Sequence, residues 1–219
     1  MDTVIKDTCY KGTRILLGNE KQEYLQKCRE YLKAEGFTEI QIPIIQHCEI
    51  FAGKVGEENN NMMYNLTDRG GRDLALSPEY TAVVQKLSST YFKNQKDVKL
   101  FYVAECFRGE KPQAGRYRQF TQLGVEVLNP TNIKSVIVNK QISNLALHAQ
   151  IMIGFLEEAF PMHTNYHVKR GLDYYKEGKG FEITCEELGS SKQVCGGGEY
   201  EGGIGFAIGV CRLMDLIKK

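Results

Sequence analysis

The chain has 219 residues, which suits one domain with a sizeable core, and its 42% hydrophobic and 25% charged residues are typical of a globular protein. The net charge of +1 provides no overall attraction to nucleic acid, so any such contact has to be a local patch. No apolar run approaches the roughly 20 residues of a membrane span and no signal peptide opens the chain, so we expect no membrane contact. Seven scattered cysteines without a Cys-x-x-Cys pair favour reduced thiols in a cytoplasmic protein over a disulfide framework or a zinc site. Since neither a repeat nor a linker is visible, we expect a single domain over residues 1–219.

The first strongly periodic segment is a helix, which follows Lys11-Gly12-Thr13-Arg14 and a short loop. Asn19 is suited to its N-cap, with Gln22 three positions further on. Gly36 supplies the stop signal. Between these limits, apolar residues recur at helical spacing, namely Tyr24, Leu25, Cys28, Tyr31 and Leu32.

A strand is predicted directly after this helix, over residues 37–45. Ile40, Ile42 and Ile44 fall on one face of it. Pro43 lacks the N–H that a central strand needs, so we expect this strand at an edge or an interface.

A second helix is expected to begin at Pro78, with Ser77 as its cap, and to run to Leu87. Glu79 then lies in the first turn, where a carboxylate is favourable beside the helix dipole. The residues alone leave two roles open for Glu79, a capping group or a member of a binding site.

Residues 105–128 are the most informative stretch, because two strand-like pieces flank a polar loop. Residues 99–107 read as a buried strand. On the second piece, one face is an ordinary core face, formed by Thr121, Leu123, Val125 and Val127. The opposite face carries Gln122 and Glu126 in mid-strand, where burial without partners is costly. This pattern fits both a surface hairpin with a solvated outer face and the floor of a polar pocket beside Arg108.

The loop of this hairpin is strongly basic, since it contains Lys111, Arg116 and Arg118. Together with Arg108 these side chains carry enough positive charge to hold a polyphosphate.

The C-terminal part begins with a helix predicted over residues 133–160. The glycines at 196–198 allow close backbone approach to a ligand. Residues 205–209 then lead a strand into a helix whose first turn bears Arg212. From the glycine spacing alone, a structural contact between helix and strand explains these residues equally well.

Several segments together resemble the class II aminoacyl-tRNA synthetases, and among them most closely the histidyl-tRNA synthetase family. Motif 2, at about residues 100–128, is similar in Phe107-Arg108-Gly109-Glu110 and Gly115-Arg116-Tyr117-Arg118-Gln119-Phe120. The Leu-Arg-Pro-Glu-Gly-Thr signature resembles Leu76-Ser77-Pro78-Glu79-Tyr80-Thr81. The histidyl family's own signature, at residues 170–183, is similar to Arg170-Gly171-Leu172-Asp173-Tyr174-Tyr175 with Phe181-Glu182-Ile183. Residues at about 21–45 look like motif 1, and those at about 195–214 look like a shortened motif 3.

The resemblance implies an α+β fold, the class II aminoacyl-tRNA synthetase core, in which an antiparallel sheet is flanked by helices and paired as a homodimer. The insertion domain and the C-terminal anticodon-binding domain of the family have no counterpart in this sequence. The chain also departs from the family's residues at four positions, namely Ser77 for Arg, Tyr80 for Gly, Glu199 for Arg and Cys211 for an acidic residue.

The chemistry that the resemblance implies is attack of the histidine carboxylate on the α-phosphate of ATP, followed by transfer of the histidyl group to tRNA. Arg108 and Arg170 are the implied catalytic residues, and Arg170 is the implied charge clamp for the transition state. Amino-acid binding is implied for both of these arginines and for Glu79, Thr81, Gln122, Glu126, Tyr174 and Tyr175. ATP binding is implied for Arg108, Glu110, Arg116, Phe120 and Arg212. Mg²⁺ is shared by the phosphates, and no residue is assigned as a protein metal ligand.

Three functions stay open at this point. The first is a histidyl-tRNA synthetase that charges tRNA(His) through contacts at its acceptor stem. The second is a paralogue that passes the activated amino acid to another acceptor, which the departures at Tyr80, Glu199 and Cys211 favour. The third is a non-catalytic regulatory subunit resembling that of ATP phosphoribosyltransferase. It ranks last, because such a subunit is expected to lose ligand residues that this chain keeps.

Overall fold

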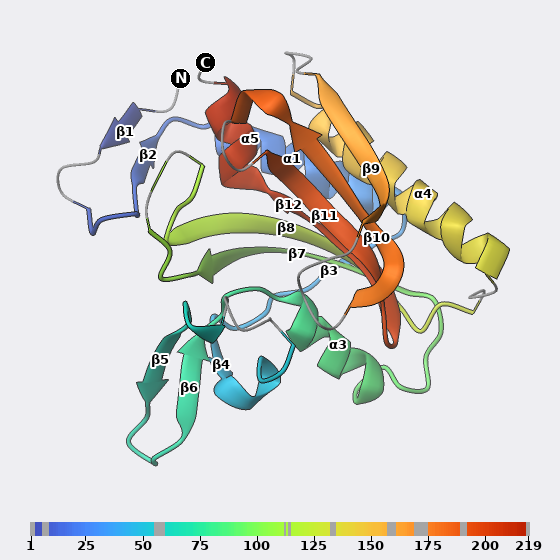
Figure 1. Ribbon diagram of the computed structural model, residues 1–219, viewed down its shortest axis with the longest axis horizontal. Helices are drawn as coiled ribbons and strands as arrows, with labels where there is room; N and C mark the ends of the chain where they lie inside the picture. Colours follow the sequence, from blue (N-terminus) through green and yellow to red (C-terminus); the bar gives the residue numbers. More distant parts are fainter. Residues whose placement is uncertain are drawn as a thin grey trace.

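The computed structural model describes residues 3–5, 9–54, 60–111, 113, 115–131, 135–156, 161–168, 175–188 and 192–217. Its centre is a seven-stranded sheet in the order β3-β7-β8-β12-β11-β10-β9 (Figure 1). All neighbouring strands run antiparallel except β3, which is parallel to β7. The strands are β3 (Thr38–Glu39), β7 (Val98–Phe107), β8 (Gln119–Leu128), β9 (Met162–Val168), β10 (Tyr175–Cys185), β11 (Gln193–Tyr200) and β12 (Gly203–Gly209).

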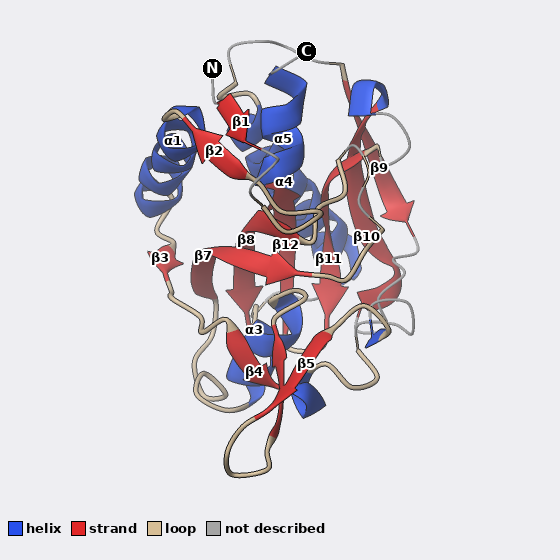
Figure 2. Ribbon diagram, turned by 90° about the vertical axis from the view of Figure 1, so that its left-hand side faces the viewer, coloured by secondary structure: helices blue, strands red, loops and turns tan. Residues whose placement is uncertain are grey.

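Helices cover this sheet on both faces. Three of them, α1 (Glu20–Ala34), α4 (Ser135–Ile153) and α5 (Val210–Ile217), pack on one face, over the larger hydrophobic core. The opposite face carries α3 (Thr81–Ser89) and a smaller core. Beyond α3 lies a three-stranded sheet in the order β4-β6-β5, which occupies the end of the molecule away from α5 (Figures 1 and 2).

The remaining elements are short. The small sheet consists of β4 (Ile45–His47), β5 (Tyr64–Thr67) and β6 (Asp73–Leu76), and two 3-10 turns are η1 (Cys48–Ile50) and η2 (Glu186–Leu188). At the N-terminus, β1 (Thr3–Ile5) pairs with β2 (Ile15–Leu17). Within the described part of the chain, no helix is both long and apolar enough to cross a membrane. No disulfide joins the seven cysteines, all of which lie in that part.

The first predicted helix is confirmed as α1, and its expected apolar face is buried except for Tyr31, which is partly buried. Asn19 occupies the N-cap, but its side chain makes no capping hydrogen bond. Gly36 adopts φ +81°, and Phe37 N–H donates to Leu32 O at 2.9 Å while Gly36 N–H donates to Lys33 O at 3.1 Å. This pair of bonds satisfies the last carbonyls of the helix, and it needs a residue that tolerates positive φ.

The strand predicted over residues 37–45 is wrong in its extent. Only β3 at the start and β4 at the end are paired, and they belong to different sheets. The chain leaves the large sheet after Glu39, and the Ile44 carbonyl accepts hydrogen bonds from the N–H and the hydroxyl of Ser77 instead. The predicted edge position is confirmed for β3, which borders the large sheet.

The predicted start of the second helix is also wrong, because α3 begins at Thr81 rather than at Pro78. Ser77 is not its cap, since its hydroxyl donates to Ile44 O. The Glu79 carboxylate takes that role and accepts from the N–H groups of Thr81 at 2.7 Å and Ala82 at 3.0 Å. The third helix is shorter than predicted, as α4 ends at Ile153. The two strands of the hairpin match their predictions as β7 and β8.

Candidate functional site

The inner end of the candidate site is a buried carboxylate on β8. Leu123 and Val125 point into the larger core, so Glu126 faces the other side of the sheet, toward α3. Its side chain is fully buried and accepts hydrogen bonds from Tyr200 Oη at 2.7 Å and Thr81 Oγ1 at 3.3 Å.

Burial raises the pKa of Glu126 to about 8. The charge of Glu79 raises this pKa further, whereas the hydrogen bonds from Tyr200 and Thr81 lower it. A further hydrogen-bond donor or a cation beside Glu126 would therefore favour its ionised form and lower its pKa.

Two glycines on neighbouring strands make room for the side chains of Glu126 and Tyr102. Gly205 lies opposite Glu126 on β12, and a Cβ there would lie 1.7 Å from Glu126 Oε2. Gly124 lies opposite Tyr102 on β7, and a Cβ there would lie 2.1 Å from Tyr102 Cζ. Since neither distance is physically possible, each side chain crosses its neighbouring strand only because that strand carries glycine.

Tyr102 and Tyr200 are site residues that the sequence analysis missed. Both rings are buried, and Tyr200 packs edge-on against Tyr175 with 6.4 Å between ring centroids. The Tyr102 hydroxyl makes no hydrogen bond to any residue that the structure describes. Burial raises the pKa of Tyr102, and the charges of Glu126 and Glu79 raise it further. A buried hydroxyl that has no partner among the described residues and lies near two carboxylates can donate a hydrogen bond to a bound ligand.

Glu79 and Thr81 join this cluster from the start of α3. The capping role of Glu79 is confirmed by its two backbone hydrogen bonds, and its side chain is 3% exposed. Because its charge also acts on Glu126, the same carboxylate contributes to the field in the site. Gln122 lies further along β8 and accepts from Cys106 Sγ at 3.2 Å.

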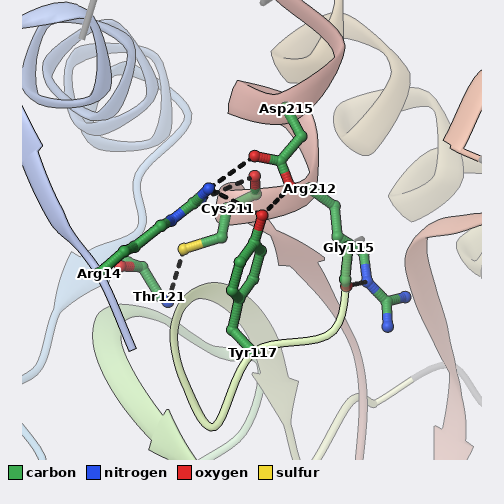
Figure 3. Close-up of polar contacts among 7 residues, drawn as sticks. All are labelled: Arg14, Gly115, Tyr117, Thr121, Cys211, Arg212 and Asp215. Atoms are coloured by element: carbon green, nitrogen blue, oxygen red, sulfur yellow. Dashed lines mark hydrogen bonds and ion pairs between the residues drawn. The ribbon is translucent and has the colours of Figure 1, made fainter. Parts of the chain in front are cut away.

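Three arginines, Arg108, Arg116 and Arg212, lie at or beside the loop between β7 and β8. Arg212 donates from Nε to Gly115 O at 3.0 Å (Figure 3) and from Nη1 to Gln193 O at 2.7 Å. Burial lowers the pKa of Arg212; the charge of Glu110 raises it, while Arg108 and Arg116 lower it. These effects place the three guanidinium groups within electrostatic reach of one another, with Glu110 among them.

The individual contacts of the hairpin groups support this arrangement. Arg116 Nε lies 3.8 Å from Glu110 Oε2. Arg108 donates to Pro78 O at 2.9 Å, and its Cζ lies 5.2 Å from the centre of the Phe120 ring. Arg108 therefore links the start of α3 to the basic loop. Two of the predicted site residues, Arg170 and Tyr174, lie outside the described residues.

The four departures from the family pattern are accommodated in the protein interior. Tyr80 is buried, donates to Glu105 O at 2.9 Å and packs its ring against Tyr102 at 5.4 Å. Glu199 is 4% exposed and pairs with Lys176. Cys211 accepts a hydrogen bond from Thr121 N–H at 3.3 Å. Tyr80 thus packs against the ring of Tyr102 in the interior instead of projecting into solvent.

This architecture is that of a class II aminoacyl-tRNA synthetase core. Apo histidyl-tRNA synthetase from S. aureus matches with a TM-score of 0.71 and 25% identity, over 97% of this chain and 70% of that chain. An ATP phosphoribosyltransferase regulatory subunit/histidyl-tRNA synthetase from Bacillus halodurans has a TM-score of 0.74 over 100% of this chain and 85% of that chain. Its 13% identity shows a shared fold alone.

The family model for histidyl-tRNA synthetase matches residues 19–157, and the chain belongs to this family. The histidine–tRNA ligase of Methanocaldococcus jannaschii is 39% identical over 148 residues. That match covers 66% of this chain and 35% of the Methanocaldococcus enzyme, so it spans about a third of that relative's length.

Proposed function

We propose that this chain activates histidine with ATP to form histidyl-adenylate and pyrophosphate, and that it transfers the histidyl group to tRNA(His) through contacts at the acceptor stem. The observation that carries the proposal is the buried, hydrogen-bonded carboxyl of Glu126, which shares one face of β8 with Gln122. An imidazole presents an N–H donor, which a carboxylate accepts. Family membership supports the same substrate.

The amino-acid end of the proposed site is acidic. In this assignment Glu79, Thr81 and Gln122 hold the α-ammonium group of histidine. Glu126 reads the imidazole together with Tyr174 and Tyr175. The unused Tyr102 hydroxyl and the Tyr200 ring add to the same pocket, since both lie beside Glu126.

The ATP end is basic. Arg108, Arg116 and Arg212 hold the phosphates, and Phe120 offers its ring to the adenine. Because these guanidinium groups lie within electrostatic reach of one another, part of their mutual repulsion is relieved when a polyanion binds. Among the described residues, no group of three or more His, Cys, Asp or Glu side chains could hold a metal ion. Mg²⁺ would be carried mainly by the phosphates, where it would supply charge neutralisation, with Glu110 as the carboxylate at hand.

Catalysis in this proposal is positioning and charge stabilisation. Arg108 and Arg170 clamp the carboxylate and the α-phosphate, which brings the nucleophilic oxygen to phosphorus and stabilises the negative charge of the transition state. No covalent enzyme intermediate is needed. The protein is proposed to act as a homodimer through motif 1, because the family's dimer contact lies there.

A paralogue that transfers histidine to another acceptor is the second candidate. The observation in its favour is buried Glu199, which pairs with the half-exposed Lys176 and reverses the charge at a position where the family has arginine. The non-catalytic regulatory function is the third, and the shared fold with the Bacillus protein is its support.

The decisive experiment is ATP–pyrophosphate exchange with each of the twenty amino acids, followed by aminoacylation of tRNA(His). Exchange with histidine alone is expected, and Glu126→Gln is expected to weaken it through the KM for histidine. Exchange with histidine but no charging of tRNA would favour the paralogue. If folded protein exchanges with no amino acid, the enzymatic proposal is wrong and a regulatory role moves to first place.

A further inference from the structure

A partly buried polar cluster lies beside the basic loop and contains none of the predicted ligand residues. Arg14 Nη1 donates to Asp215 Oδ1 at 2.7 Å and to Tyr117 Oη at 2.9 Å (Figure 3). Tyr117 Oη in turn donates to Asp215 Oδ2 at 2.7 Å. The Arg14 side chain is 8% exposed, and its Cζ lies 4.0 Å from the centre of the Tyr117 ring. The three side chains thus form a closed triangle.

The triangle joins three separate parts of the chain. Arg14 precedes β2, Tyr117 lies in the loop between β7 and β8, and Asp215 lies on α5. Arg14 Nη2 also donates to the carbonyl of Cys211 on α5 at 3.3 Å. One guanidinium group therefore contacts both the basic loop and the helix that carries Arg212.

The same N-terminal segment holds the loop at a second point. Arg118 N–H donates to Gly12 O at 2.7 Å, and its side chain donates to Tyr10 Oη at 2.7 Å. On the other side of the loop, Arg212 donates to Gly115 O. Among the loop residues that the structure describes, the one bridge is an isolated pairing between Gln113 and Arg116. The contacts with residues 10–14 and α5 add to the loop's own hydrogen bonds, such as Arg116 N–H to Gln113 O at 2.9 Å, and fix the loop against the rest of the domain.

The charges in the triangle favour its closed form. Burial acts to lower the pKa of the Arg14 guanidinium, but the hydrogen bond and charge of Asp215 outweigh it and raise this pKa overall. Burial raises the pKa of Tyr117, and its hydrogen bond to Asp215 raises it further. Arg14 and Asp215 thus form a partly buried ion pair, and removal of one partner leaves the charge of the other uncompensated.

We propose that Arg14, Tyr117 and Asp215 are positioning residues that lock the basic loop onto α5, and so hold Arg116 and Arg212 in the geometry that binds the phosphates of ATP. This inference rests on the proposed function. None of the three groups needs to touch ATP. Their effect is to order the loop before ATP arrives, so that binding does not incur the entropy loss of ordering it.

The test compares Tyr117→Phe, Arg14→Met and Asp215→Asn with the unchanged protein. Tyr117→Phe is the mildest, since it removes one hydroxyl and keeps the ring under Arg14. Arg14→Lys is the conservative rescue, because lysine can pair with Asp215 but cannot span Tyr117 and the Cys211 carbonyl as well. Arg72→Met is the control, as it breaks an Arg–Asp pair with Asp68 at the far β5–β6 hairpin. Two quantities are measured, hydrogen–deuterium exchange of residues 115–119 and the KM values for ATP and histidine in pyrophosphate exchange.

We expect faster deuterium uptake in the loop and an ATP KM raised about tenfold in Tyr117→Phe and Arg14→Met, with the histidine KM within about twofold. Arg14→Lys should recover part of the ATP KM, and Arg72→Met should change neither quantity. Unchanged loop exchange in Tyr117→Phe and Asp215→Asn would overturn the inference, as would equal rises in both KM values. If the variants release the loop but the unchanged protein neither binds ATP nor supports exchange, the proposed function fails while the structural lock stands.

Discussion

Replacement of Glu126 by glutamine should change how the stability of the protein depends on pH. The folded protein binds the Glu126 proton with a pKa of about 8, against an ordinary value of 4.5. Between these two pH values the folded state holds more protons than the unfolded state, so the free energy of unfolding falls as pH rises. The slope approaches about 1.4 kcal/mol per pH unit, which amounts to roughly 3 kcal/mol between pH 5 and pH 8. The glutamine of the Glu126→Gln variant cannot ionise, so the free energy of unfolding of this variant lacks the decrease that ionisation of Glu126 causes. It should therefore gain stability relative to the unchanged protein as pH rises.

The assay is urea unfolding of both proteins at pH 5, 6, 7 and 8, without ligands. Glutamine keeps the shape of the side chain and can still accept from the Tyr200 hydroxyl, so the comparison isolates the ionisation of the carboxyl group. Glu201→Gln is the matched control, because it removes an exposed carboxylate from the residue that follows Tyr200 in the chain. A stability difference between Glu126→Gln and the unchanged protein that stays constant from pH 5 to pH 8 would refute the reasoning.

Three further substitutions test other parts of the site. Gly205→Ala should cost about 2–3 kcal/mol of stability, because its Cβ would lie 1.7 Å from Glu126 Oε2, and an unfolding midpoint equal to that of the parent protein would contradict this. Tyr200→Phe removes a hydrogen bond that lowers the pKa of Glu126, so this pKa should rise. The KM for histidine should rise with it. A histidine KM equal to the parent value would count against Glu126 as the group that binds the imidazole. Arg212→Lys should raise the KM for ATP about tenfold, because lysine cannot bond to two carbonyls and face a phosphate at once. An equal rise in the KM for histidine would contradict a role confined to ATP.

The hairpin at the centre of the molecule could be predicted from sequence because alternation fixes the faces of a strand. Leu123 and Val125 could face only the core, so Glu126 had to face the other way. Whether that second face was solvent or a pocket depended on what covers it. The answer comes from α3 and from Tyr200, which lies more than seventy residues further along the chain. Local periodicity carries no information on such a contact.

The errors have equally local causes. The capping rules favoured Ser77 beside Pro78, yet the Ile44 carbonyl competes for the serine hydroxyl, and the longer Glu79 side chain reaches the start of α3. Tyr102 was missed because a buried tyrosine in an apolar run looks the same in sequence whether or not its hydroxyl has a partner. Tyr200 was missed because it stands between glutamates and glycines, where no periodic pattern marks its face. The glycines at 124 and 205 are a usable signal in retrospect, since each marks the place where a neighbouring side chain crosses the strand.

The arrangement of charges along β8 suggests how the proposed site would orient its amino acid. Phe120 and Glu126 lie on the same face of the strand and are six residues apart, or about 20 Å at the usual rise per residue. Acidic groups dominate near Glu126, and guanidinium groups dominate near Phe120. A zwitterion in this gradient turns its ammonium group toward Glu79 and its carboxylate toward Arg108. The carboxylate then points at the phosphates, which is the approach that attack on the α-phosphate requires. In the proposed site, the orientation of the amino acid would thus follow from the order of residues along one strand.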